Sequence, residues 1–234
     1  MRIITSKVVF TDPTTIDDQP RGFEHQRYVF HDDETISLAV FSVAKDKGIT
    51  RDVIINFDPF WRPIDSYVRI HLGSRLEGSG WFRFTEDAVS ADIWNHTTGL
   101  DRQSVSVSPG AIAFGAHPIA TDMVIAAAYD RGTKESIQLL PNVFLSSKHH
   151  FGATGPEIAP VRLQLEYLGR ERISAAGSTF DTDRWRILEG NELTAHNHPG
   201  EVFWTLQDSF VFVRAEIPST GYKYLLSQID DVST

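Results

Sequence analysis

Hydrophobic and polar residues alternate with a period of two along most of this chain. Successive side chains of a β-strand point to opposite faces, so the alternation predicts strands with one buried face. The predicted strands cover residues 3–10, 23–31, 35–43, 51–57, 64–72, 80–85, 89–96, 102–108, 135–140, 161–168, 172–187, 201–207, 210–217 and 221–229.

Turn-forming residues separate many of these strands. Short strands at this spacing favour an antiparallel meander that closes or nearly closes on itself. A parallel α/β sheet would need a helix between most strands, and the pattern does not provide them. We therefore predict an all-β fold, either a large antiparallel barrel or a curved, clam-like sheet of lipocalin-like type. The predicted turns are Asp32-Asp33, Lys47-Gly48, Glu77-Gly78-Ser79-Gly80, Ser108-Pro109-Gly110, Pro199-Gly200 and Ser219-Thr220-Gly221.

Only one segment, residues 119–131, has the composition of a helix. It is rich in alanine, and Thr121 or Asp122 could cap its N-terminus. Residues 148–160 form the longest irregular stretch, but the alternation resumes on both sides of it. We interpret this stretch as a mobile loop over the mouth of the barrel and predict a single domain, 1–234.

The composition of the chain excludes several classes of binding partner. The formal net charge of −9 argues against a nucleic-acid partner, because binding phosphates requires a basic face. The chain has no cysteine, which excludes disulfides and cysteine-ligated metal sites. No stretch approaches the ~20 apolar residues of a membrane span, and the N-terminus alternates like a strand. We expect a cytoplasmic protein that binds no membrane and could form a homodimer.

Three consecutive predicted strands, 64–72, 80–85 and 89–96, each have one aliphatic or phenylalanine face and one aromatic and charged face. The second face could be a solvated surface on which aromatic rings pack under arginine stems. Alternatively it is a ligand pocket, because small-molecule sites combine aromatic walls with a few polar groups, and an arginine fork suits a carboxylate. Such a pocket would hold a flat or greasy acid. The predicted ligand-binding residues are Tyr67, Arg69, Trp81, Arg83, Trp94 and His96.

The remaining histidines offer few metal sites. His196 and His198 are two residues apart, as in the metal-binding strand of a cupin, but no histidine follows to complete the set. A polar turn before a buried strand explains them equally well. His149 and His150 are adjacent and point in opposite directions on an extended chain. We therefore predict no metal and no cofactor.

The segment Phe114–Asp122 is the strongest candidate for chemistry. His117 precedes a proline, and Asp122 lies at the start of the predicted helix. Histidine titrates near neutrality and can act as a general base, with a carboxylate to orient it. The structural alternative is that Asp122 caps the helix and His117 fills a turn. No serine-hydrolase elbow, P-loop or dinucleotide fingerprint competes with this predicted catalytic pair.

The C-terminal third resembles a family of uncharacterised bacterial β domains, domain of unknown function 3108. The resemblance rests on Leu165–Ile173, on Ala176–Thr182 and on a closing hairpin at Val202–Asp208. It implies an antiparallel β fold of curved-barrel type and no particular reaction.

These patterns favour a cofactor-independent enzyme, an isomerase, hydratase or lyase. It would use acid–base chemistry on a small hydrophobic, aromatic or terpenoid molecule in a barrel pocket. A non-catalytic carrier of an apolar ligand and a structural or interaction module are the alternatives.

Overall fold

The computed structural model describes residues 1–13, 20–149, 151–188, 199–207 and 209–233. The strands are β1 (Arg2–Thr11), β2 (Gly22–Phe30), β3 (Ile36–Ala44), β4 (Ile49–Phe57), β5 (Pro63–Leu72), β6 (Arg75–Phe84), β7 (Ala88–Asn95), β8 (Gly99–Ser106), β9 (Ala113–Gly115), β10 (Ile137–Leu145), β11 (Ala159–Ala175), β12 (Ser178–Ile187), β13 (Glu201–Leu206), β14 (Phe212–Ile217) and β15 (Tyr222–Ser233). The helices are α1 (Ile119–Met123) and the 3₁₀ turns η1 (Lys45–Lys47) and η2 (Val124–Ala128). None of the helices described is long and apolar enough to cross a membrane.

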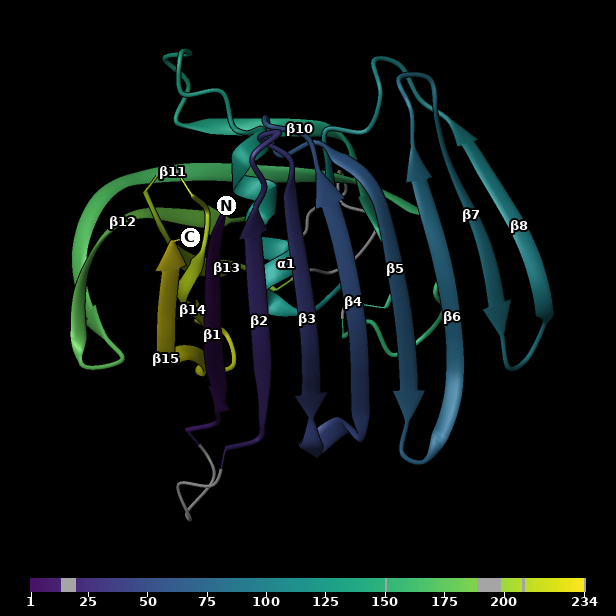
Figure 1. The fold of residues 1–234 in the computed structure, drawn as a ribbon, viewed down its shortest axis with the longest axis horizontal. Coiled ribbons are helices and arrows are strands. Elements are labelled where there is room, and N and C mark those ends of the chain that lie inside the picture. Colours follow the sequence, from purple (N-terminus) through teal and green to yellow (C-terminus); the bar gives the residue numbers. More distant parts are fainter. Residues whose placement is uncertain (14–19, 150, 189–198, 208, 234) are drawn as a thin grey trace.

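All fifteen strands form one sheet in the order β8-β7-β6-β5-β4-β3-β2-β1-β15-β14-β13-β12-β11-β10-β9. Neighbouring strands are antiparallel except β9 and β10, which are parallel. The first and last strands of the chain pair with each other, so the meander continues through both termini. The sheet curves around α1 (Figure 1), which confirms the predicted all-β fold with a large curved sheet.

The sheet is barrel-like but its ends do not pair. Its β9 end lies inside the curl, where Phe114 packs on Phe82 and Phe84 of β6 with ring centroids 5.0 Å apart in each pair. Its other end, β8, remains at the surface, and most of its residues are exposed. A hydrogen bond of 2.8 Å from the Ile158 amide to Gln103 Oε1 links β8 to the chain inside. The strands therefore form an open spiral.

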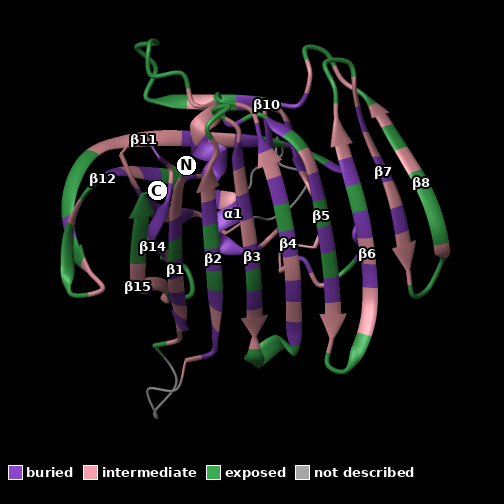
Figure 2. Cartoon of the chain, viewed as in Figure 1, coloured by how far each residue is buried: buried purple, intermediate pink, exposed green. Residues whose placement is uncertain are grey.

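The interior is filled by α1 and by the inward-facing residues of the strands. Four of the five residues of α1 are buried. The strands alternate between buried and exposed positions (Figure 2), as on β4, where Val53 and Ile55 are buried and Ile54 between them is exposed. The largest fully buried side chains include Trp185, Tyr28, Phe57, Phe82, Phe114, Phe144, Phe203 and Phe212.

The predicted helix over 119–131 is shorter in the structure. Helical structure ends at Ala128, and Tyr129 adopts an extended conformation. The Asp130 carboxylate then accepts the Gly132 amide, which forms a turn instead of another helical residue. Short-range hydrogen bonding by aspartate competes with helix continuation.

Two strand boundaries were also predicted wrongly. The predicted strand 172–187 is a hairpin, and its turn lies at Ala176 and Gly177, which have φ of 49° and 74°. An Ala-Gly pair is a weak turn signal, because alanine rarely adopts positive φ. The predicted break after residue 168 is a bulge at Leu168, between the paired residues Tyr167 and Gly169, and β11 continues through it.

The predicted turn at Glu77–Gly80 lies inside β6. A Cβ atom at Gly78 would come within 2.5 Å of the Gly155 carbonyl oxygen and 2.7 Å of Pro156 Cδ. The loop after β10 therefore crosses the inner face of β6 so closely that only glycine fits beneath it.

We expect Gly78→Ala to lower the free energy of unfolding by ~1–3 kcal/mol, because the new methyl group overlaps backbone atoms that cannot move independently. Ser79→Ala, the next residue on the opposite face, is the control and should change it by less than about 0.5 kcal/mol. Urea unfolding measures both. Equal stability of the two variants would contradict the close approach of the loop.

Candidate functional site

The predicted site residues lie on opposite faces of the sheet. Tyr67 and Trp81 point outward, whereas their neighbours Val68 and Phe82 are buried. Asp122 lines a cavity on the inner side, together with His117. The sequence analysis placed both groups in one barrel pocket, and this arrangement is wrong because the sheet separates them. The structure contains two candidate sites, the outer groove and the inner cavity.

The outer groove crosses the exposed face of the sheet from β15 to β5 and has a volume of about 670 Å³. The residues that pair across neighbouring strands form two parallel rows of side chains in this groove. The first row contains Thr5, Arg27, Ala39, Ile54 and Tyr67. The second row contains Lys7, His25, Phe41, Asp52 and Arg69.

One wall of the outer groove is apolar and exposed. Phe41 is 40%, Ile54 46% and Tyr67 39% exposed, which is high for large hydrophobic side chains that lie close together. Ala39 lies between Arg27 and Ile54 in the first row, and because its side chain is small the groove is deeper at this position. The groove thus offers an apolar surface of the size that small molecules occupy.

The charges in the outer groove are unevenly paired. Arg69 forms an ion pair of 2.8 Å with Asp52, so this predicted ligand-binding arginine already has a carboxylate partner. Lys7 and Arg27 have no ion-pair partner in the described part of the chain, and Asp230 is the remaining acid of the lining. Two cations against one acid give the groove a local net charge of +1 on a chain of −9.

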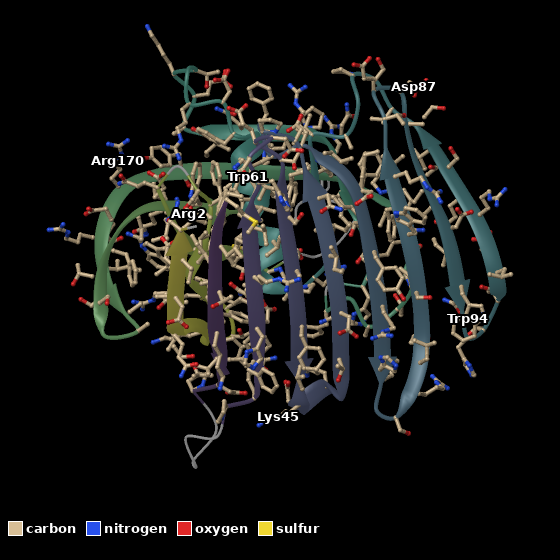
Figure 3. All side chains as sticks on the ribbon, in the orientation of Figure 1. Arg2, Lys45, Trp61, Asp87, Trp94 and Arg170 are labelled. Carbon is tan, nitrogen blue, oxygen red and sulfur yellow. The ribbon has the colours of Figure 1, made fainter. Side chains whose placement is uncertain are left out.

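The other four predicted ligand-binding residues continue the same face beyond the outer groove. Arg83 lies 4.4 Å from the Trp81 ring centroid and forms an ion pair of 2.8 Å with Asp92. Trp94 lies near the β7–β8 end of the sheet (Figure 3), and His96 follows it in the exposed turn. These residues match the solvated alternative, aromatic rings under paired arginines.

The inner cavity has a volume of about 70 Å³, and the Glu24 carboxylate on its wall is completely buried. Glu24 accepts hydrogen bonds from the amides of Ile119 at 2.6 Å and Ala120 at 3.3 Å, the first residues of α1. Gln26 and Ser42 donate two more, at 3.0 and 3.2 Å. Glu24 therefore fixes the start of α1 to β2 and β3.

His117 and Asp122 contact each other, but through the backbone. Asp122 Oδ1 accepts the His117 amide at 3.0 Å and so holds His117 at a φ of 71°. The imidazole Nε2 lies 3.2 Å from the Ser147 carbonyl oxygen, which can only accept. A neutral imidazole must then carry its proton on Nε2, which makes Nδ1 the basic nitrogen. The predicted orientation of the ring by Asp122 is therefore replaced by Ser147.

Three further buried charged residues line the inner cavity: Arg21 is 6% exposed, and Arg51 and Glu201 are each 4% exposed. Arg51 Nη2 donates to the carbonyl oxygen of Phe151, while Arg51 Nε and Glu201 Oε1 have no hydrogen-bond partner among the described residues. Phe151 belongs to the stretch 148–160, so this part of the predicted loop contributes to the lining of the cavity.

Burial dominates the electrostatics of the inner cavity. Desolvation raises the pKa of Glu24 and Asp122 to about 7 each, against the hydrogen bonds that favour their charged forms. It raises the pKa of Glu201 to about 8, and the charges of Asp122 and Glu24 add to the effect. Burial also lowers the pKa of Arg51 to about 10. The three acids therefore share fewer than three negative charges near neutral pH.

Among the described histidines, His25 lies in the outer groove and His149 lies in the loop that follows β10. His149 Nδ1 accepts the Phe151 amide at 3.2 Å and orders the loop. His150, His196 and His198 lie outside the described residues. Among the residues described, no three His, Asp or Glu side chains are grouped as a metal site would require.

Sequence reasoning missed Glu24, Arg51 and Glu201 at the inner cavity. Glu24 and Arg51 occupy inward positions of β2 and β4, where the alternation calls for apolar residues. A charged residue at an apolar position is a usable signal, because burying it is costly unless it has a role. In the outer groove, Lys7, Arg27, Phe41 and Ile54 were missed because the pattern does not reveal which distant strands become neighbours.

Comparison with known proteins supports the fold. The chain matches no family model and no curated protein. It is similar to a solved β-barrel-like protein of Domain of Unknown Function DUF1849 from Brucella abortus, with a TM-score of 0.56 and 10% identity over 99% of this chain and 97% of the other. A trans-AT PKS dehydratase domain from Brevibacillus brevis gives a TM-score of 0.14 at 11% identity, over 97% of this chain and 76% of the other, too low to indicate a shared fold. The resemblance to domain of unknown function 3108 stays a prediction.

The raised pKa values predict that stability falls as pH rises. From about pH 4.5, the usual value of glutamate, to about pH 8, the folded protein holds more protons on Glu24, Asp122 and Glu201 than the unfolded chain does. Glu201→Gln should remove about one proton of this difference and flatten the dependence by up to ~1.4 kcal/mol per pH unit. Urea unfolding at pH 5.5, 7.0 and 8.5 measures it, with Glu86→Gln at an exposed position as control. An unchanged slope in Glu201→Gln would show that Glu201 ionises normally.

Proposed function

We propose that the protein binds a small amphipathic carboxylic acid in the outer groove. The observation that carries the proposal is the combination of an exposed apolar wall with two cations that have no ion-pair partner in the described part of the chain. The carboxylate would bind Arg27 and Lys7, and the apolar part would cover Phe41, Ile54 and Tyr67. A guanidinium fork matches a carboxylate in geometry, and a volume of about 670 Å³ lies within the usual range for small-molecule sites.

This proposal differs from a carrier whose ligand lies inside the barrel. Aromatic side chains and α1 occupy the interior, and the inner cavity of about 70 Å³ is too small for a terpenoid or a long acyl chain. The outer groove keeps the class of ligand expected from the sequence, a hydrophobic acid, and includes the predicted residues Tyr67 and Arg69. It differs from the expectation in lying on the outer side of the sheet and not inside a barrel.

Titration with decanoate, followed by calorimetry, tests the proposal. Decanol has the same chain without the charge and should bind roughly tenfold more weakly, because it loses the charge-assisted hydrogen bonds. Arg27→Gln should weaken decanoate binding to a similar extent. Arg162→Gln, at an exposed position on β11 away from the groove, is the matched control and should leave it unchanged.

A second pair of variants tests the location. Ala39→Phe should block the outer groove without disturbing the core, because Ala39 faces outward. Ala88→Phe places the same side chain on the outward face of β7, outside the groove, and should bind decanoate normally. Decanoate binding that survives Ala39→Phe would refute the proposed site.

We also propose, as a second function, acid–base chemistry at the inner cavity, with His117 as the base. The specific observation is that His117 lines the inner cavity together with the buried Asp122, which accepts the His117 amide at 3.0 Å. The substrate would have to be much smaller than the molecules expected from the sequence. Proton transfer by a positioned group typically contributes ~10²–10⁴-fold to a rate.

Deuterium exchange tests this second function without a known substrate. The native protein in D₂O should speed the exchange of the methyl protons of pyruvate, observed by NMR, and His117→Gln should abolish the acceleration. Asp122→Asn should reduce it less, because an asparagine oxygen can still accept the His117 amide. Exchange at the same rate with and without protein would exclude pyruvate-type chemistry at His117.

A further inference from the structure

Arg51 is the most unusual charged residue of the protein. Its side chain is 4% exposed, and its one hydrogen bond among the described residues runs to the Phe151 carbonyl oxygen, a neutral acceptor. No carboxylate of the described residues lies within the 4.0 Å of an ion pair with it. A buried charge without a counter-ion is costly, and in proteins such charges are usually paired or bind a ligand.

The nearby acids do not remove this cost. Glu24 and Asp122 act on Arg51 through their charge, but their oxygens are engaged elsewhere. Glu24 accepts four hydrogen bonds, two of them from α1, and Asp122 accepts the His117 amide. Moving either carboxylate to Arg51 would release backbone amides inside the core. Arg51 Nε therefore keeps an unused donor beside the inner cavity.

Glu201 also has a buried polar atom without a hydrogen-bond partner among the described residues. It is also 4% exposed and lines the same cavity, and its Oε1 has no hydrogen-bond partner in the part of the chain that the structure describes. Burial raises its pKa to about 8, so near neutral pH the side chain is mainly a neutral carboxyl group with an O–H to donate. The cavity is thus bordered by an unused guanidinium N–H and a carboxyl group.

We propose that the inner cavity binds a small carboxylate, with Arg51 as its counter-ion. A carboxylate oxygen accepts from the Arg51 guanidinium, and the ligand supplies the counter-charge that Arg51 lacks among the described residues. Glu201 borders the same cavity. A phosphate or sulfate is a poorer match, because its additional charged oxygens would face Glu24 and Asp122.

The size of the inner cavity limits the ligand. A volume of about 70 Å³ is little more than twice the ~30 Å³ that one water molecule occupies in the liquid. Formate and acetate fit this limit, whereas hexanoate and longer acids do not. Lys47, whose side chain is 37% exposed, also lines the cavity and brings its edge to the surface, where the ammonium group attracts anions.

The test is calorimetric titration of the native protein with acetate and formate at constant ionic strength. Both should bind, and hexanoate and sodium phosphate should not bind at this site. Arg51→Met should bind acetate at least about tenfold more weakly, as expected for the loss of a charge-assisted hydrogen bond. Arg162→Met is the matched control at an exposed position. Arg51→Lys keeps the charge and should retain part of the affinity, so the comparison does not depend on Arg51→Met being stable.

This site is independent of the outer groove, and the experiment separates the two. Ala39→Phe should leave acetate binding unchanged while it blocks decanoate. No heat from acetate or formate with the native protein would overturn the proposal, as would equal affinity in native protein and Arg51→Met. A response to phosphate or chloride equal to that for acetate would overturn the carboxylate assignment.

Discussion

The structure depends on burying one end of its own sheet. A strand at the edge of a sheet has unpaired backbone groups, and most folds expose it or close it into a barrel. Here β9 lies inside the curl, where Phe114 packs on Phe82 and Phe84. The chain that follows β10 crosses β6 at Gly78, where no side chain would fit. The curvature of the sheet and the filled interior both follow from this packing.

A polar connection between helix and sheet accompanies this packing. Glu24 satisfies the first amides of α1, so a carboxylate must lie in the core beside the helix. Arg51 and Glu201 share the small cavity next to it. The inner side therefore combines a dense apolar core with one charged cavity, while the open groove lies on the outer side. The sheet therefore separates the charged inner cavity from the partly apolar outer groove.

The alternation of the sequence was sufficient to predict the fold class and most strands. Every second residue of a strand lies on the same face, so the sequence shows which residues share a face. It could not predict the curl, which depends on a contact between Phe114 and β6, at least thirty residues earlier in the chain. The alternation also placed Tyr67, Arg69, Trp81 and Trp94 correctly on one face. It gave no information on which side His117 would lie, since that residue follows an irregular segment. The charged residues at inward positions, Glu24 and Arg51, were a signal in the sequence that we did not use.

The exposed strand β8 has a consequence for how this fold can change. In a closed barrel the number of strands and their stagger are linked, so adding or removing a strand alters the whole circumference. In an open spiral the outer end of the sheet does not have to pair with another strand, so the number of strands there is not fixed by closure. Most of β8 is exposed, so strands could be gained or lost there without repacking α1 or the inner cavity. The sheet can therefore change in length at this end while the core keeps its geometry.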